Sequence, residues 1–283
     1  MTQGKNIRLL AVDMDGTCLN SRSQMTAETI HALEAAAKAG IIVVPTTGRS
    51  LSCLPHRLAG RQNIYRYVIS SNGASVADCR EKKEWMQTLI PKEQALRLVR
   101  ACSGKYDKKK IGSTAHIRHE YYVEGRLLSF FGRLFFGKDA TKLRTVRSME
   151  EVFEKSPYDV EEVQFYFLSA GGKRRIREIL QGFPELSCAY TPIYVEIFAK
   201  RGIKGEALAF LSERLGIAKE EVACIGDGEN DSTMFEAAGL RFAMGNAVPE
   251  LKEKADFILP GNDRDGAAEG IWRILGEKCI RLQ

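Results

Sequence analysis

The sequence predicts an α/β fold, a Rossmann-like doubly wound parallel sheet core that carries an inserted α+β cap domain. Short apolar runs alternate with helical patterns in both terminal parts of the chain, as in parallel sheets with crossover helices. Several of these runs end in loops rich in Asp, Thr, Asn and Gly. The alternation is lost in the middle of the chain. We therefore expect a core formed by residues 1–82 and 195–283, interrupted by an insert of residues 83–194.

The first expected strand, in the stretch IRLLAV at residues 7–12, is an almost unbroken apolar run. Such a run predicts a strand that is buried on both faces. It ends at Asp13 and Asp15, followed by Gly16. Residues two apart on an extended chain point to the same side, so we expect both carboxylates just past the strand, where open α/β sheets bind ligands. A solvated Asp-Gly turn is the alternative, and the similar loops later in the chain weaken it.

The remaining elements are predicted from periodicity and from Gly and Pro breaks. In the core we expect, in order, a helix at 27–39, a strand at 41–45, an intervening helix, a strand at 67–70, a helix at 204–215, strands at 222–225, 241–244 and 256–259, and a final helix at 267–275. In the insert we expect a helix at 92–102, a strand at 163–168, a basic helix at 173–180 and a strand at 193–198.

Composition limits the class of protein. The chain has 283 residues, 44% of them hydrophobic, and no run of apolar residues long enough for a membrane span. Its seven cysteines include no CxxC pair, which argues against both a disulfide framework and a zinc site. The first residues lack the apolar region of a signal peptide. We expect a cytoplasmic protein, as a monomer or a homodimer.

The positive charge is concentrated in the middle of the chain. The net charge is +6, and residues 80–190 hold 22 Lys and Arg against 15 Asp and Glu. A solvated surface explains such a bias, and so does a lid over anionic substrates. No recognised nucleic-acid-binding motif occurs, so no nucleic-acid partner is expected.

Four carboxylates are predicted to meet at the C-terminal edge of the sheet. They belong to Asp13, Asp15, Asp227 and Asp231. Such a cluster does not stay fully ionised without a cation, and hard oxygen ligands with room for water suit Mg²⁺.

Groups that can hold a phosphate accompany these carboxylates. The hydroxyl of Thr47, the N–H of Gly48 at an expected helix start and the ammonium of Lys204 can bind one. Carboxylates, magnesium and phosphate-binding groups together indicate phosphoryl transfer.

Two other stretches resemble known binding motifs, but each has a residue that does not fit the motif. The stretch GDGEN has Asp231 where a dinucleotide-binding fingerprint needs its third glycine. The stretch GRLFFGKD imitates a phosphate-binding P-loop, but Asp139 stands where Ser or Thr must bind Mg²⁺. We interpret the nearby aromatics as packing of the insert rather than as a substrate-facing patch; they are Phe130, Phe131, Phe135 and Phe136.

The ordered set of motifs DMDGT, TTGR, SNGA, RGIKGEAL, GDGEND and MGNA resembles the haloacid-dehalogenase superfamily. More narrowly, it is similar to the Cof-type phosphatases, which carry a large α/β cap. The resemblance covers the whole chain, by motif in the core and by position and size in the cap. The one departure is Ile203, which stands where the usual form has Ser before the lysine.

That resemblance implies a role for each motif residue. Asp13 would be the nucleophile that forms an aspartyl-phosphate, and Asp15 the general acid and then the general base. Mg²⁺ would bind the Asp13 carboxylate, the Asp15 backbone carbonyl and Asp227. Asp231 would orient Lys204 or a metal-bound water.

The resemblance also implies how the phosphate is held. The groups that would bind it are the Met14 N–H, Thr47, Gly48, Lys204 and Asn230. Asn72, at the expected junction with the cap, would reach the substrate. For Arg49 and Asn72 the residues leave a structural alternative open, respectively a helix start and a tight turn.

The implied activity is Mg²⁺-dependent hydrolysis of a small phosphorylated metabolite, with sugar phosphates as the expected class. A phosphomutase on the same fold is an alternative, because it would return the phosphoryl group to the sugar. A non-catalytic protein whose basic insert binds a polyanion or nucleic acid is a second alternative.

Overall fold

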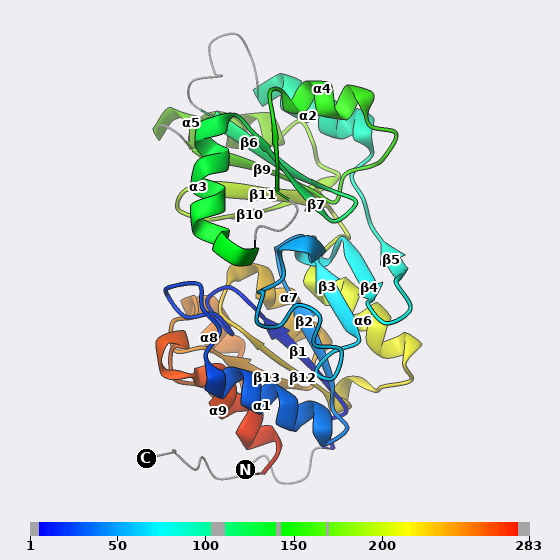
Figure 1. Cartoon of the computed structure of the whole chain (residues 1–283), viewed down its shortest axis with the longest axis vertical. Helices are drawn as coiled ribbons and strands as arrows, with labels where there is room; N and C mark the ends of the chain where they lie inside the picture. Colours follow the sequence, from blue (N-terminus) through cyan, green and yellow to red (C-terminus); the bar gives the residue numbers. More distant parts are fainter. Residues whose placement is uncertain (1–5, 103–110, 140–142, 168–169, 277–283) are drawn as a thin grey trace. The chain divides into compact units, whose positions relative to one another are not determined.

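The computed structural model describes residues 6–102, 111–139, 143–167 and 170–276. The chain forms two compact units, each shown in Figure 1. The core unit comprises residues 1–48, 55–86 and 204–283, and the insert unit comprises residues 49–54 and 87–203. The core unit thus extends a few residues beyond the expected boundary at 82. It resumes at Lys204 rather than at 195, and the short segment 49–54 packs with the insert unit.

The core unit is built on one sheet, and the described strands run in the order β14-β13-β12-β1-β2-β3-β4-β5. The pairs from β14 to β3 are parallel and the pair β3–β4 is antiparallel. The strands are β1 (Leu9–Asp13), β2 (Ile42–Thr46), β3 (Tyr67–Ser70), β4 (Ser75–Asp78), β5 (Lys83–Gln87), β12 (Val222–Gly226), β13 (Leu240–Ala243) and β14 (Phe257–Ile258).

Strands β1 and β12 lie side by side at the centre of this sheet, and every residue of both is buried. Both are short apolar runs, as expected for strands covered on two faces. From β1 the chain continues to β2 and β3 toward one edge of the sheet, whereas from β12 it continues to β13 and β14 toward the other edge. Because the crossovers are right-handed, the helices that follow β1 and those that follow β12 cover opposite faces. This is the doubly wound α/β core that the sequence predicted.

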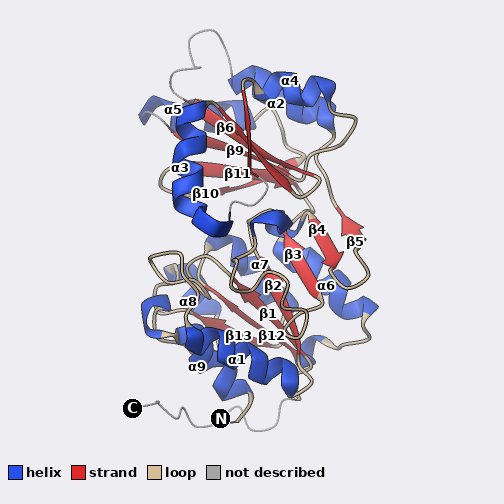
Figure 2. Cartoon of the chain, in the orientation of Figure 1, coloured by secondary structure: helices blue, strands red, loops and turns tan. Residues whose placement is uncertain are grey.

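Helices cover this sheet, and Figure 2 marks them among the strands and loops. Helix α1 packs against α9, and α6 packs against α7. Helix α1 begins where the Thr26 hydroxyl caps the N–H of Thr29. The α-helices are α1 (Ala27–Lys38), α6 (Lys204–Arg214), α7 (Ser232–Ala237), α8 (Pro249–Lys254) and α9 (Gly266–Ile274); the 3₁₀ helices are η1 (Leu51–Cys53, in the insert unit), η2 (Ser71–Gly73), η4 (Lys219–Glu221), η5 (Glu229–Asp231) and η6 (Asn262–Arg264).

The insert unit has its own sheet, with the described strands in the order β10-β11-β9-β6-β7-β8. Only the pair β7–β8 is parallel among the pairs described. The elements are β6 (Ile111–Ile117), β7 (Glu120–Glu124), β8 (Leu143–Val146), β9 (Glu162–Phe167), β10 (Leu186–Tyr190), β11 (Tyr194–Ala199), α2 (Lys92–Cys102), α3 (Arg126–Phe136), η3 (Gly137–Asp139), α4 (Met149–Lys155) and α5 (Ala170–Leu180).

Two apolar clusters stabilise the insert unit. The larger one joins α2, α4 and α5 to the sheet through buried side chains such as Leu98, Phe153 and Ile176. The smaller one joins Cys53, from the segment 49–54, to Tyr121 and neighbouring side chains of β7 and β8. A unit with its own sheet and its own core meets the physical definition of a domain.

The expected packing of the phenylalanines near residue 130 is correct for one of them and wrong for two. Phe136 packs against the smaller cluster. Phe130 and Phe131 are exposed on α3 instead, at 62% and 55%. They continue a stripe with Leu127 and Leu134 at the i, i+3, i+4, i+7 spacing of one helix face. The side chain of Phe135 lies outside the described part of the structure.

The predicted helix between residues 46 and 67 is also wrong. That segment contains the 3₁₀ helix η1 and a series of turns, so Gly48 does not lie at the start of an α-helix. Pro55 lies within the segment, and a proline restricts the residue before it to extended conformations; Leu54 has φ −55° and ψ 145°. Within the described residues, no helix is both long enough and apolar enough to span a bilayer.

Candidate active site

The candidate site lies where two neighbouring parallel strands end. Strand β1 ends at Asp13, and the adjacent β12 ends at Gly226, directly before Asp227. Because both strands run in the same direction, these carboxylates reach the same edge of the sheet. The 3₁₀ helix η5 then returns the chain, so that Asp231 lies beside them.

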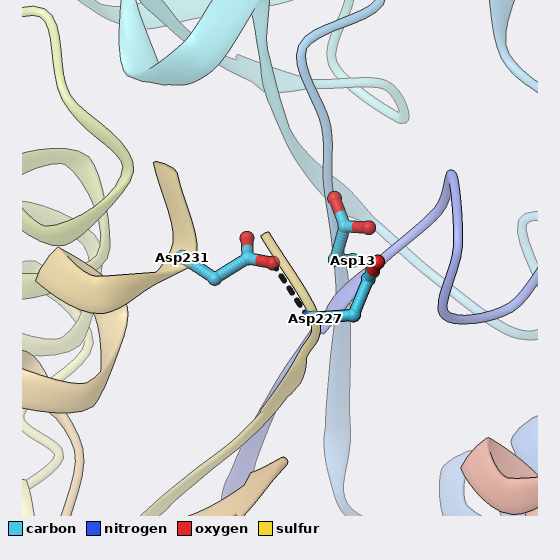
Figure 3. A group of neighbouring side chains, drawn as sticks. All are labelled: Asp13, Asp227 and Asp231. Carbon is cyan, nitrogen blue, oxygen red and sulfur yellow. Dashed lines mark hydrogen bonds between the residues drawn. The ribbon is translucent and has the colours of Figure 1, made fainter. Parts of the chain in front are cut away.

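Three carboxylates converge at this edge, from Asp13, Asp227 and Asp231 (Figure 3). One oxygen from each lies within 4.8 Å of the others. Asp13 is 5% exposed and Asp231 is 1% exposed, so both charges are largely removed from water. Such a group needs a compensating cation.

Lys204 supplies one cation. Its Nζ donates hydrogen bonds of 2.7 Å to Oδ1 of Asp13 and of 2.7 Å to Oδ1 of Asp231. The side chain is buried at the first residue of α6, which is where the sequence placed it. Three carboxylates and one ammonium leave the cluster with a formal charge of −2.

Asp231 acts as an anchor within the cluster. Its Oδ2 accepts hydrogen bonds of 2.9 Å from the backbone N–H groups of Asp227 and Gly228, the first of which is drawn in Figure 3. Its Oδ1 is taken by Lys204. Asp231 therefore orients both Lys204 and the loop that carries Asp227, which agrees with one of the two roles predicted for it.

The Asp227 carboxylate accepts hydrogen bonds from Thr17, in the loop that follows β1, and from Asn246. The Thr17 hydroxyl donates to its Oδ1 at 2.7 Å, and the Asn246 amide donates to its Oδ2 at 3.3 Å and to the Gly16 carbonyl at 2.8 Å. The Asn246 contacts were not foreseen. A signal was present, because Asn246 follows β13 as Asp227 follows β12.

Asp15 does not join the cluster as the sequence argument expected. Strand β1 ends at Asp13 and Met14 lies in a turn, so the alternation that would align the two carboxylates is broken. The Asp15 side chain is exposed. Its backbone forms an isolated bridge with Leu19, and the Met14 carbonyl accepts from the Leu19 N–H at 2.8 Å.

Burial dominates the acid–base properties of the cluster. Burial, with smaller contributions from the carboxylates of Asp231 and Asp227, raises the pKa of Asp13 well above its ordinary value although Lys204 opposes the shift. Burial and then the Asp231 carboxylate raise the pKa of Asp227 to about 7, against the hydrogen bond from Thr17. Burial would lower the pKa of Lys204, but the two carboxylates that it contacts raise it instead.

These residues fit a divalent cation. One lysine does not offset the burial of three carboxylates, and a second cation would favour the ionised forms of Asp13 and Asp227. Carboxylate oxygens that can be supplemented by backbone carbonyls and water are ligands suited to Mg²⁺. The residues that could hold such an ion are Asp13 and Asp227, with the backbone carbonyl of Asp15.

Gly16 keeps the first loop close to Asp227. Its φ is +81°, a left-handed conformation that glycine adopts without strain. A Cβ at this position would lie 2.2 Å from Oδ2 of Asp227. Glycine is therefore required here for two reasons: it adopts the left-handed conformation of the turn, and it leaves room for the Asp227 carboxylate.

Several predicted phosphate-binding residues also line the edge of the core unit. Thr47 follows β2, and its carbonyl accepts from the Asn72 N–H at 3.1 Å. Asn72 adopts a left-handed φ of +58°, and its Oδ1 accepts from the Asn230 amide at 2.8 Å. The Asn72 side chain thus orients the amide of Asn230, and this hydrogen bond lies within the core unit.

Arg49 belongs to the insert unit, where it contacts an acidic side chain, a backbone carbonyl and an aromatic ring. Its guanidinium pairs with the buried Asp139 at 2.8 Å and donates to the Cys53 carbonyl at 3.2 Å. It also stacks over the Phe136 ring at 5.0 Å from the ring centre. These contacts give Arg49 a structural role, although not the helix start that the sequence left open, and they give Asp139 an ion-pair partner.

Comparison with known proteins agrees with this geometry. Residues 10–271 match the family of haloacid dehalogenase-like hydrolases. Phosphatase YwpJ of Bacillus subtilis (strain 168) is 31% identical over 291 residues, which cover 95% of this chain and 100% of the relative.

Solved structures give the same result. A haloacid dehalogenase-like hydrolase from B. subtilis superposes with a TM-score of 0.81 at 27% identity, covering 94% of this chain and 99% of the other. A sugar phosphatase of haloacid dehalogenase subclass IIB superposes with a TM-score of 0.80 at 25% identity, covering 95% and 99%.

The matches extend over nearly the whole of each chain, so they include the insert as well as the core. The resemblance drawn from the motifs is confirmed. This chain belongs to the haloacid dehalogenase-like hydrolase family and is an enzyme of its phosphatase type.

Proposed function

We propose that the protein is a Mg²⁺-dependent phosphomonoester hydrolase that acts on a small phosphorylated metabolite, a sugar phosphate, through an aspartyl-phosphate on Asp13. The observation that carries the proposal is the buried Asp13 carboxylate, fixed by Lys204 beside Asp227 at the end of β1. A weak nucleophile in such a place is activated by position and by neighbouring cations.

One oxygen of Asp13 is available for reaction. Its Oδ1 accepts the hydrogen bond from Lys204, whereas its Oδ2 has no hydrogen-bond partner among the described residues. In the first step, Oδ2 would attack the phosphorus of the ester, and the bond from phosphorus to the leaving oxygen would break. Lys204 would hold the carboxylate still, which lowers the entropic cost of reaching the reactive geometry.

Asp15 would move the protons. In the first step its carboxyl would give a proton to the leaving alcohol oxygen. In the second step its carboxylate would take a proton from water as that water attacks phosphorus, and the bond to Asp13 would break to release inorganic phosphate. Its exposed side chain on a fixed loop is compatible with both transfers.

The metal and the phosphate-binding residues would stabilise charge. Mg²⁺ bound by Asp13, Asp227 and the Asp15 carbonyl would supply electrostatic stabilisation of the phosphoryl oxygens. The Met14 N–H, Thr47, Gly48, Lys204 and Asn230 would hold the remaining oxygens. Asn72 would act through Asn230, whose amide it orients.

The preference for sugar phosphates is supported by the subclass IIB sugar phosphatase, which matches this chain over nearly its full length. We assign the choice of leaving group to the insert unit. Its excess of basic residues would favour anionic substrates, an effect that weakens with salt.

The direct test is phosphate release across a panel of about a hundred phosphorylated metabolites, with and without Mg²⁺. We expect turnover of sugar phosphates in Mg²⁺ and little in EDTA, and Asp13→Asn should abolish turnover. Full activity in EDTA would exclude the metal, and Asp13→Asn within tenfold of the wild type would exclude the nucleophile, because tenfold is about 1.4 kcal/mol of barrier. Retention of the phosphoryl group on an isomerised sugar would identify a mutase.

The covalent step has its own test. An aryl phosphate has a leaving group that needs no proton, so Asp15→Asn should still transfer its phosphoryl group to Asp13 but hydrolyse the product slowly. Mass spectrometry of the intact protein should show the phosphorylated form in Asp15→Asn and none in the double variant with Asp13→Asn. Phosphorylation in the double variant would contradict the assignment.

A further inference from the structure

The insert unit contains a cavity that the proposed chemistry does not use. Its volume is about 790 Å³, within the range of sites for small-molecule ligands. It lies between the end of β6, strands β7 and β8, and helix α4 with the turn that follows it. The residues that decide its chemistry are Arg118, Tyr122, Arg144, Arg147, Lys155 and Tyr158.

This cavity lies on one particular face of the insert sheet. Successive residues of a strand point to opposite faces. On β7, Tyr121 and Val123 belong to the smaller cluster that contains Cys53, whereas Tyr122 packs with the larger cluster and lines the cavity. The cavity is thus on the opposite face of this sheet from the segment 49–54.

The cavity is basic. Its lining has four basic side chains and two acidic ones, Glu120 and Glu151, so its formal net charge is +2. Glu120 is engaged by Arg144 at 2.6 Å, and Glu151 by Lys155 at 3.2 Å. Both acids are therefore already neutralised.

Two cations remain without an acidic partner among the described residues. The Arg118 guanidinium donates to the Tyr158 hydroxyl at 2.9 Å and lies 4.6 Å from the centre of the Tyr158 ring. Arg147 has no hydrogen bond or ion pair with any described residue. An excess of positive charge in a concave site raises the local concentration of anions.

The walls between the charges are apolar or aromatic. Tyr122, Val146, Val152 and Pro157 line the cavity together with the Tyr158 ring. Rings of a ligand can stack on tyrosine faces or on guanidinium planes. We propose that this cavity is a binding site for a phosphorylated ring compound, of the size and charge of a mononucleotide, and that it is separate from the carboxylate site.

The two sites differ in composition. The carboxylate site consists of core-unit residues, and the cavity consists of insert-unit residues, so they share none. The described residues that line the cavity include two carboxylates, each paired with a cation, so these residues offer no ligand set for Mg²⁺. Binding in the cavity should therefore persist in EDTA, which also prevents hydrolysis of a probe.

The test is isothermal titration calorimetry of the full chain with adenosine 5′-monophosphate, pyrophosphate and adenosine, all in EDTA. We expect saturable binding of the mononucleotide, weaker binding of pyrophosphate, which lacks the ring, and no measurable binding of adenosine, which lacks the charge. Binding that is equally strong for adenosine would overturn the charge argument.

Arg147→Gln is the decisive variant because the side chain is exposed and its loss should leave the fold intact. It should weaken mononucleotide binding tenfold or more. The matched control is Arg174→Gln, which removes the same charge from an exposed position on α5 outside the cavity and should change the affinity less than twofold.

Two kinds of result would overturn the proposal, one in the binding measurements and one in catalysis. One is the absence of mononucleotide binding, or equal binding by both variants. The other is a loss of aryl phosphate hydrolysis in Arg147→Gln, which would make the cavity part of the catalytic site. Failure of the phosphatase proposal would instead appear as absent turnover in the wild type, whatever the calorimetry shows.

Discussion

At Gly16, the absence of one side chain allows Asp227 to stay where the metal proposal needs it. Gly16→Ala would place a methyl group 2.2 Å from Oδ2 of Asp227, and that carboxylate would have to move. We expect the affinity for Mg²⁺ to fall at least tenfold, about 1.4 kcal/mol. Calorimetric titration with Mg²⁺ measures the effect.

The chain offers a matched control for this substitution. Gly40 also has a left-handed φ, +86°, but a Cβ there would meet nothing within 4 Å. Both alanine variants should lose roughly 1–3 kcal/mol of stability to backbone strain. Only Gly16→Ala should lose metal affinity, and equal affinities in the two variants would contradict the role given to Gly16.

Lys204 is the second residue whose removal has a distinct signature. Lys204→Met would leave the buried carboxylates of Asp13 and Asp231 without their shared cation. Breaking a buried ion pair from one side costs about 3–5 kcal/mol. Urea denaturation in EDTA should show a loss of this size, and Mg²⁺ should recover part of it by binding the folded state.

The control for Lys204→Met is Lys219→Met, an exposed lysine in η4. It should change the free energy of unfolding by less than about 0.5 kcal/mol. If Lys204→Met were equally mild, the two carboxylates would have to be stabilised by other means than this lysine.

At the scale of elements, the core could be predicted because local and tertiary signals agree there. Strands β1, β12 and β3 are apolar runs with Asp, Asn or Gly at their ends, and helices α1 and α6 have clear apolar stripes. The site followed from the same rule, since the C-terminal ends of parallel strands share one edge. Sequence reasoning was therefore enough to place Lys204, Asp227 and Asp231 beside Asp13.

The features that could not be predicted depend on a local break in periodicity or on contacts distant in sequence. Asp15 alternates with Asp13 in sequence, but the chain leaves the strand at Met14, so periodicity failed at that point. Thr17 and Asn246 act on Asp227 from 210 and 19 residues away. In the insert, strand β9 was predicted from its own pattern, but its antiparallel partner β6 was not, because that pairing joins segments far apart in sequence.

Helix α3 provides a test at this scale. Its Leu134 is 70% exposed, whereas Leu98 on α2 is 0% exposed in the larger cluster of the insert unit. Leu98→Ala should cost about 2–5 kcal/mol, because it removes buried apolar surface and leaves a cavity. Leu134→Ala should cost less than about 0.5 kcal/mol. Thermal unfolding of the two variants makes the comparison.

The result for Leu134→Ala has a further use. A loss comparable to that of Leu98→Ala, and dependent on protein concentration, would show that a second copy covers the stripe of Leu127, Phe130, Phe131 and Leu134 in solution. An exposed stripe predicts no such dependence.

At the scale of the whole molecule, the two units divide the proposed work. The core unit contains all three clustered carboxylates and Lys204, and the insert unit has a separate sheet and core. In the proposed mechanism, chemistry at phosphorus would therefore need only core residues. We assign the selection among leaving groups to the insert unit, because the core unit lacks this property in our proposal.

Replacing residues 87–203 by a short Gly/Ser linker tests this division. The segment 49–54 packs with the insert unit, and Cys53 would lose its partners Tyr121, Val123 and Leu143. The variant should therefore also carry Cys53→Ser, so that no buried thiol becomes an exposed one. We expect the remaining core to hydrolyse aryl phosphates in Mg²⁺, because an activated leaving group needs few contacts.

The same variant should lose its preference among metabolites, since in the proposed mechanism the core residues contact only the phosphoryl group and the leaving oxygen. The measurement is kcat/KM over a panel of sugar phosphates for the full chain and for the shortened one, with circular dichroism to establish that the shortened chain is folded. Asp13→Asn in the shortened chain is the control for residual chemistry. If the folded core alone ranked the sugar phosphates as the full chain does, the leaving group would be chosen by core residues, and the role assigned to the insert would be wrong.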